Sequence, residues 1–505
     1  MPPRKANFTE LIVSPSAAAT RERFLDMLAR AKIGCITRLE TTGDCLVHFE
    51  SSKEPDVKRA VEKLRQNIHA LAPAAFDQAD QRLVGDVFAN ESFEIEDDKD
   101  EGEWIWPATP VVPPVSNDPY FSEQEQLVAL NAVLAWEGVN ERQPVIVAVL
   151  DEGISLDQPD LKGNLEPGIS LGCDPQQYQC DGSPALPTDQ HGTKVAGVIS
   201  AVRNNGIGIV GAAWHARIIP INIGVRGGSD ITAACGVEIA VRRGAYVINA
   251  SWWHRKRLKE LYKVLLAADP RVVFVSGAGS GGNVISAAYP SYPLLDNLTN
   301  VVGVAAHRDT DQPLKGSNRS KQYVHITAQA YAYTTLICQK CMNCYGQEYG
   351  NTSYATAYVS AMVALLKSRY PDWSSEWIKW RIVEDAIDSN KLKPMSASGG
   401  RLDLGRTMFP VTTTPTSVSR GGPTLVDWKT GIRGDMCPQV SIHVRVGEAG
   451  NMGTYSVAIP LTDNDGDESV SADRLPSGQA KQIQFLVSCT NSKADAASPP
   501  IDLIN

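Results

Sequence analysis

VIVAVLDEGISLDQPDL, residues 145–161, indicates the fold of this chain: six apolar residues end abruptly in acidic and small ones at Asp151. Helix-like stretches such as ITAACGVEIAVRRG separate this run from later ones. Because runs apolar on both faces alternate with helices, we predict an α/β fold with a doubly wound parallel sheet. The later apolar runs are RIIPINI (217–223), YVINAS (246–251), VVFVSG (272–277) and VVGVAA (301–306).

Composition divides the rest of the chain around this sheet. Residues 1–90 alternate strand-like and helix-like patterns, which predicts a small α+β domain. An acidic and proline-rich linker at 91–119 leads to the sheet domain at 120–410. A second linker, 411–424, precedes residues 425–505, whose alternating apolar and polar positions predict a small antiparallel β-domain.

Charge and hydropathy exclude some classes of partner. The net charge of −9 gives no reason to expect nucleic acid as a ligand. No apolar run approaches the roughly 20 residues of a membrane helix, so no membrane span is expected. The N-terminus has no continuous apolar segment typical of a signal peptide, which favours the cytoplasm; secretion is the alternative if the chain begins further upstream.

Three residue types needed for nucleophilic catalysis follow strands or open helices. Asp151 ends the first apolar run, His191 opens the helix-like HGTKVAGVIS, and Ser353 opens SYATAYVSAMVALL. A serine nucleophile needs a base, and that base needs an acid that orients it and stabilises its charged form. Active sites of parallel sheets lie at the carboxyl ends of strands, where Asp151 is expected. Together the three residues predict a serine hydrolase.

The order Asp, His, Ser and the flanking residues resemble the subtilisin-like serine proteases (subtilases). LDEGI with QPDL matches the family's aspartate motif, HGTKVAG (191–197) its histidine motif, and Thr352, Ser353 and Ala355 its serine motif. The resemblance implies a serine endopeptidase that works through an acyl-enzyme and requires no cofactor for its chemistry. It also implies that residues 7–85 form a ferredoxin-like propeptide, an intramolecular inhibitor of the enzyme.

The resemblance also implies a substrate cleft, and here the sequence departs from the family. The implied substrate-binding residues are Ser251, Trp252, Trp253, Gly277, Ala278 and Gly279. Trp253 stands where the family usually has glycine, so an indole should narrow or fill the pocket; the alternative is that both tryptophans pack in the core. Ser280 replaces the asparagine that donates to the oxyanion, and Asn283 is a possible substitute donor. Because of these departures a second hypothesis stands beside the protease: a catalytically impaired homologue that binds a peptide or protein.

Two cation sites are also suggested. RNNGIGIVG (203–211) resembles the family's calcium loop, which implies Asp160, Asn205, Ile207 and Ile209 as oxygen ligands of a structural calcium; the alternative is a loop that persists without an ion.

The spacing of Cys338, Cys341 and Cys344 could place three thiolates on zinc, with disulfides or free thiols as alternatives.

Overall fold

The computed structural model describes residues 116–409, apart from 138, 140–143, 172–186, 188, 225–227, 309–310, 338–343 and 351. It also describes four N-terminal strands within residues 8–89 and ten C-terminal strands within 411–504. Two helices expected between residues 20 and 69 and most of the linker at 91–119 lie outside these residues.

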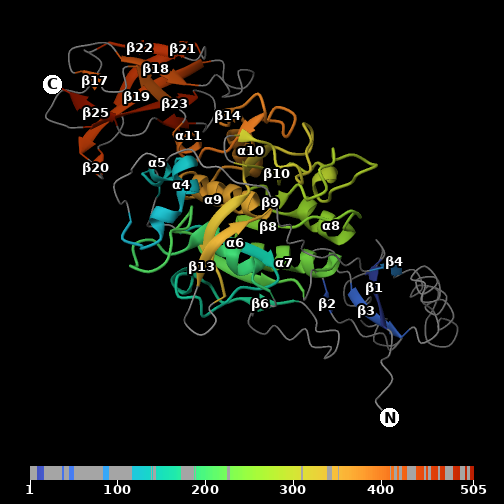
Figure 1. Ribbon diagram of the computed structural model, residues 1–505. Coiled ribbons are helices and arrows are strands. Elements are labelled where there is room, and N and C mark those ends of the chain that lie inside the picture. The colour runs from blue at the N-terminus through green and yellow to red at the C-terminus, as the bar shows by residue number, and fades with distance from the viewer. Residues whose placement is uncertain are drawn as a thin grey trace.

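A nine-stranded sheet organises the central part of the molecule (Figure 1). Its strand order is β14-β15-β11-β10-β9-β8-β5-β7-β6, and every neighbouring pair is parallel except β14 with β15. The predicted parallel sheet is therefore confirmed, with one antiparallel pair at its edge. The strands are β5 (Ile146–Asp151), β6 (Ile169–Ser170), β7 (Arg217–Asn222), β8 (Val247–Ala250), β9 (Val273–Gly277), β10 (Val301–His307), β11 (Ile326–Gln329), β14 (Ile387–Asp388) and β15 (Gly400–Arg401).

Helices cover both faces of the sheet because its strands are apolar on both sides. Along β5, Val147 and Val149 pack into one hydrophobic cluster with α6 (His191–Ser200) and α9 (Thr352–Arg369). Ala148 and Leu150 point the other way, into a cluster with α7 (Asp230–Arg242) and α8 (Lys259–Ala267). This double burial explains why the strands read as unbroken apolar runs in the sequence. The first face also carries α4 (Glu125–Ala129), α5 (Ala132–Trp136), α10 (Ser375–Glu384) and α11 (Leu404–Met408).

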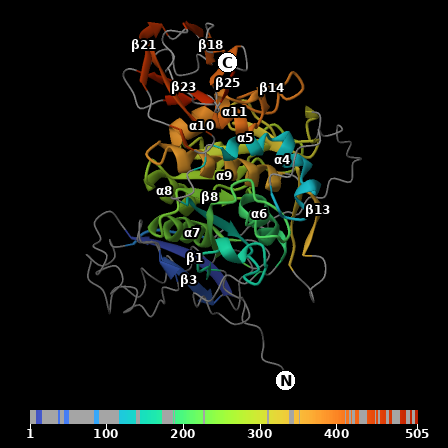
Figure 2. The ribbon, with the colours of Figure 1, turned by 90° about the vertical axis from the view of Figure 1, so that its left-hand side faces the viewer.

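A two-stranded hairpin projects from this body just before α9 (Figure 2). It consists of β12 (Tyr331–Thr335) and β13 (Tyr345–Tyr349). The Thr334 and Thr335 hydroxyls each donate to a carbonyl of α6, at 2.7 Å. Lys194 of α6 forms an ion pair with Glu348 of β13 at 3.1 Å. Hydrogen bonds and an ion pair therefore hold the hairpin against α6, the helix that begins at His191.

The two ends of the chain form separate sheets. The N-terminal strands pair antiparallel in the order β2-β3-β1-β4. They are β1 (Phe8–Pro15), β2 (Thr37–Arg38), β3 (Cys45–Glu50) and β4 (Val84–Ala89).

The C-terminal strands form a three-stranded and a seven-stranded sheet around their own small hydrophobic cluster, against which Trp377 and Trp380 of α10 pack. They are β16 (Val411–Thr414), β17 (Val418–Ser419), β18 (Thr424–Trp428), β19 (Gln439–Glu448), β20 (Asn451–Met452), β21 (Ser456–Asp463), β22 (Asp467–Val470), β23 (Gln482–Cys489), β24 (Asp495–Ala497) and β25 (Ile501–Ile504). The division into independent domains remains a prediction.

Candidate active site

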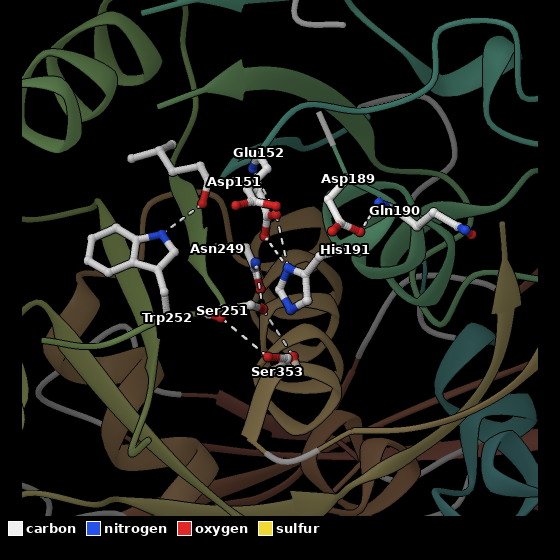
Figure 3. A network of polar contacts seen from close by, with 10 residues as sticks. Asp151, Glu152, Asp189, Gln190, His191, Asn249, Ser251, Trp252 and Ser353 are labelled. Carbon is white, nitrogen blue, oxygen red and sulfur yellow. Dashed lines mark hydrogen bonds and ion pairs between the residues drawn. The ribbon is translucent and has the colours of Figure 1, made fainter. Parts of the chain in front are cut away.

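An aspartate and a histidine meet at the carboxyl end of β5. Asp151 is the last residue of β5 and is fully buried, and His191 is the first residue of α6. The His191 Nδ1 lies 2.9 and 3.0 Å from the two carboxylate oxygens of Asp151 (Figure 3). The backbone N–H of Glu152 also donates to Asp151, at 2.9 Å. A proton on Nδ1 shared with this carboxylate leaves Nε2 as the proton acceptor of the neutral ring.

Ser353 approaches this pair from the first turn of α9. Figure 3 shows the His191 imidazole between Asp151 and Ser353. The Ser353 hydroxyl donates to the backbone carbonyl of Ser251 at 3.3 Å, and the Ser251 hydroxyl donates back to the Ser353 carbonyl at 3.0 Å. The predicted catalytic residues Asp151, His191 and Ser353 are thus brought to one place from three separate stretches of sequence.

A chain of buried polar side chains, which the sequence analysis did not predict, holds the Ser251 hydroxyl in place. The side-chain amide of Asn249 in β8 donates to the Ser251 hydroxyl at 3.0 Å. The Ser360 hydroxyl of α9 donates in turn to the Asn249 side-chain oxygen at 2.9 Å. Asn249 is fully buried, and a lone polar residue inside the apolar run VINA is the signal that could have found it.

The predicted oxyanion residues lie on the loop that follows β9. Ser280 is buried, and an isolated bridge pairs it with Ser317. Asn283 donates its backbone N–H to the Asn318 side chain at 2.9 Å and accepts from the Arg319 N–H at 3.0 Å. These bonds tie Asn283 to the neighbouring 316–319 segment. Its role as a substitute oxyanion donor remains a prediction.

The structure separates the two tryptophans that follow β8. Trp252 is buried, donates its indole N–H to the Leu150 carbonyl at 2.8 Å, and packs edge-on against Phe274. The Trp252 ring therefore packs in the core, the alternative considered above, and the assignment of residue 252 to the substrate-binding strand remains a prediction. Trp253 is only half-buried, and its indole lies against the backbone of Gly279.

The other predicted substrate-binding residues lie at the ends of strands and have small side chains or none. A Cβ on Gly277 would lie 2.7 Å from the Thr352 hydroxyl, so the small residue lets α9 approach the sheet. Both backbone polar groups of Ala278 are hydrogen-bonded within the protein. Its N–H donates to the Val304 carbonyl, and its carbonyl accepts from Ser291 and Asn318.

Two acidic side chains from outside the implied calcium loop, Asp118 and Asp160, accept hydrogen bonds from its backbone. Asp160 is buried and accepts from the Asn205 amide nitrogen and from the Ile209 backbone N–H, both at 2.7 Å. Burial raises the pKa of Asp160 to about 7, and the nearby Asp118 carboxylate adds to the effect. Ile207 donates its N–H to the Asn205 side-chain oxygen at 2.9 Å. An ion could use Asn205 only if this amide turned to present its oxygen.

The thiolate prediction is corrected at one position. Cys344 is disulfide-bonded, so its sulfur is not a zinc ligand; disulfide pairing, the alternative considered above, holds for this residue. Cys338 and Cys341 lie outside the described residues. Within the described part of the chain no group of three or more histidine, cysteine or acidic side chains could hold a metal. In the same part, no helix has the length and apolar character needed to cross a membrane.

Serine hydrolases use a histidine base that a carboxylate orients beside a serine hydroxyl. In parallel sheets such a site lies at the carboxyl ends of the strands, where these three residues are found. The sequence model of the subtilase family matches residues 142–409. The chain therefore belongs to the subtilase family, the subtilisin-like serine endopeptidases.

Named relatives agree with this assignment. Thermitase from Thermoactinomyces vulgaris is 28% identical over 257 residues, covering 50% of this chain and 85% of the relative. Subtilisin E from Bacillus subtilis is 29% identical, covering 53% of this chain and 66% of its own length. Among solved structures, fervidolysin from Fervidobacterium pennivorans superposes with a TM-score of 0.60 at 20% identity, over 96% of this chain and 71% of that one. The last similarity shows the fold alone.

Proposed function

We propose that this chain hydrolyses peptide bonds with Ser353 as nucleophile, His191 as general base and Asp151 as the residue that orients it. The observation that carries the proposal is the contact of His191 Nδ1 with both carboxylate oxygens of Asp151, at 2.9 and 3.0 Å, next to Ser353. A serine hydroxyl is a weak nucleophile without such a base.

In the proposed reaction the Ser353 hydroxyl turns from the Ser251 carbonyl to His191 when substrate binds. Its present bond to that carbonyl is long, at 3.3 Å, so little is lost in the turn. Ser353 Oγ attacks the scissile carbonyl carbon while Nε2 of His191 takes the hydroxyl proton. The proton then passes to the leaving amine, and water attacks the acyl-enzyme by the same route. Asp151 stabilises the positive charge on His191 throughout.

The negative charge of the tetrahedral intermediate requires hydrogen-bond donors. Ser353 is the second residue of α9, where backbone N–H groups have no partner within the helix and favour negative charge. We propose that the Ser353 backbone N–H is the main donor and that Ser280, with its short hydroxyl, is a weak second one. Loss of one oxyanion donor typically costs ~10²–10³ in kcat. A slow protease is the expected outcome.

We further propose that the N-terminal α+β unit is a propeptide that inhibits the enzyme until it is cleaved in the 91–119 linker. The antiparallel order β2-β3-β1-β4 supports this, because a ferredoxin-like βαββαβ unit pairs its strands in that order. On this proposal the substrate is a peptide or protein. The C-terminal strands would form a separate β-domain.

A structural calcium is proposed for the loop around Asp160. Support comes from two carboxylates, Asp118 and Asp160, at one loop and from the high pKa of Asp160, since a cation would relieve the cost of burying its charge. Oxygen atoms of Asn205, Ile207 and Ile209 would complete the site. The ion would stabilise the loop and supply no step of the reaction.

A second candidate function is peptide binding without catalysis. Trp253 packed on Gly279 and the serine at position 280 favour it, because both lie where a substrate would be bound and activated. The intact Asp151–His191 pair favours the protease, because a binding protein would have no need to preserve it.

Labelling with a fluorophosphonate separates the two functions. The wild-type chain should be labelled and should process its own N-terminal unit, whereas Ser353→Ala should do neither. Ser368→Ala, which removes another buried hydroxyl of the same helix, one that donates to the Leu365 carbonyl, is the matched control and should still be labelled. A wild-type chain that stays unlabelled and unprocessed would overturn the protease proposal and leave the binding function.

A further inference from the structure

Two strand ends flank the nucleophile, and each is bonded directly to it or its neighbour. After β8, the Ser251 carbonyl accepts the Ser353 hydroxyl at 3.3 Å. After β9, the Gly279 N–H donates to the Thr352 hydroxyl at 3.3 Å. A residue whose carbonyl carbon reaches Ser353 must therefore place its side chain beside these two strand ends.

The indole of Trp253, two residues after Ser251, lies against the strand end that follows β9. A Cβ added to Gly279 would come within 2.3–2.4 Å of Cδ2, Cε2 and Cγ of Trp253, so the ring lies directly on the Gly279 backbone. Gly279 also has a φ of +84°, a conformation that side chains disfavour. Glycine at this position thus makes room for the indole, and the indole takes the room that glycine leaves.

Neighbouring contacts hold Trp253 in this place. Next along the chain, His254 exchanges backbone hydrogen bonds with Tyr292, at 3.0 and 2.8 Å. On the other side, Trp252 is anchored in the core by its bond to the Leu150 carbonyl. The Arg255 guanidinium lies 5.7 Å from the centre of the Trp253 ring, within the range of a cation–π contact. The backbone on both sides of Trp253 is fixed, and a cation faces its ring.

We propose that Trp253 restricts cleavage to bonds that follow glycine or alanine. The inference rests on the proposed function, and it names the substrate class that the same site accepts. A leucine or phenylalanine side chain on the residue that supplies the scissile carbonyl would need the volume that the indole occupies. Glycine needs none of that volume and alanine only a methyl group. The Arg255–Trp253 contact adds a modest cost to moving the ring.

Peptide p-nitroanilides that differ only in the residue before the scissile bond test this in the full chain. Wild type should cleave after alanine on the order of 10²-fold better than after phenylalanine in kcat/KM, the discrimination expected from a filled apolar pocket. Trp253→Gly should reduce that ratio by a similar factor, and Trp253→Phe should give an intermediate ratio. Equal rates after both residues in wild type, or an unchanged ratio in Trp253→Gly, would overturn the inference.

A binding measurement decides the same question without catalysis. Products that end in alanine or phenylalanine can be titrated by calorimetry into Ser353→Ala and into Ser353→Ala with Trp253→Gly. The first variant should prefer the alanine peptide by at least tenfold, and the second should lose that preference. Equal affinity of Ser353→Ala for both peptides would overturn the inference. Failure of fluorophosphonate labelling would instead overturn only the proposed protease function, because this binding preference does not depend on it.

Discussion

The two halves of the site differ in how closely they follow the family. On one side, Asp151 and His191 meet at hydrogen-bonding distance within motifs that match the subtilases. On the other side, the strand ends carry Trp253 on Gly279 and a serine at position 280. On the proposals above, the acid–base half would activate a hydroxyl, whereas the other half would restrict which side chain can be placed against it.

The largest expected effect concerns the acid–base half. Asp151→Asn should lower kcat on the order of 10⁴-fold, because an amide would hold the wrong tautomer of His191 while leaving the geometry intact. Steady-state kinetics with an alanine p-nitroanilide measure this, and circular dichroism checks the fold. A loss of less than tenfold would show that Asp151 is not needed to orient His191.

The next effect concerns the recognition half. Ser280→Asn should raise kcat by up to about 10²-fold, because a carboxamide reaches further toward the oxyanion than a hydroxyl. KM should change little if the added bond forms only in the transition state. Asn283→Ala is the companion variant: a fall in kcat of similar size would identify Asn283 as the donor in use and would leave little for Ser280→Asn to gain.

Calcium should affect the loop that follows α6, the helix that begins at His191. At about 100 times its Kd an ion that binds only the folded state stabilises it by ~2.7 kcal/mol, which corresponds to a rise in Tm of several degrees. Asp160 has a folded pKa of about 7, above its ordinary value, so its contribution to stability is present below about pH 4 and lost as pH rises through 7. Binding of calcium releases that proton, and the stabilisation should therefore grow from pH 6 to pH 8.

Thermal unfolding with added calcium or with EDTA measures this effect. Asp160→Asn should abolish the response to calcium and should also remove the loss of stability between pH 4 and 7. If the Tm of the wild type is the same with calcium as with EDTA at every pH, the loop persists without an ion.

The smallest effect concerns a buried histidine in the segment between α6 and β7. His215 is buried beside Trp214, and neither ring nitrogen has a hydrogen-bond partner among the described residues. Burial lowers its pKa to about 4, so between pH 6.5 and 4 the unfolded chain binds the extra proton and stability falls as pH falls. His215→Phe should recover about 2 kcal/mol at pH 5 and little at pH 8. Urea unfolding at the two pH values checks it, and an equal change at both would contradict the assignment.

The strands and the acid–base residues were predictable from sequence because each follows from a local pattern. Continuous apolar runs mark strands that are buried on both faces, and β5, β7, β8, β9 and β10 lie within a residue of the predicted positions. Trp252 and Trp253 could not be distinguished in this way. They are identical neighbours, and only the direction of the chain as it leaves β8 decides which ring enters the core.

The polar contacts behind Ser353 were unpredictable for a related reason. Asn249, Ser251 and Ser360 lie far apart or alternate along the chain, and they meet only when α9 packs across the sheet. The contact of Asn205 with Asp160 likewise depends on how two loops fold back on each other. Sequence spacing carries little information about such long-range side-chain geometry.

The burial of α9 has a consequence for how the protein is made. All but the last of its residues are buried, and they pack on strands that lie earlier in the chain. During synthesis Asp151 and His191 leave the ribosome well before Ser353, and the helix that carries Ser353 has a site to occupy only after β8 to β11 have assembled. If Ser353 is the nucleophile, the nascent chain can therefore hydrolyse no peptide bond before these strands have assembled.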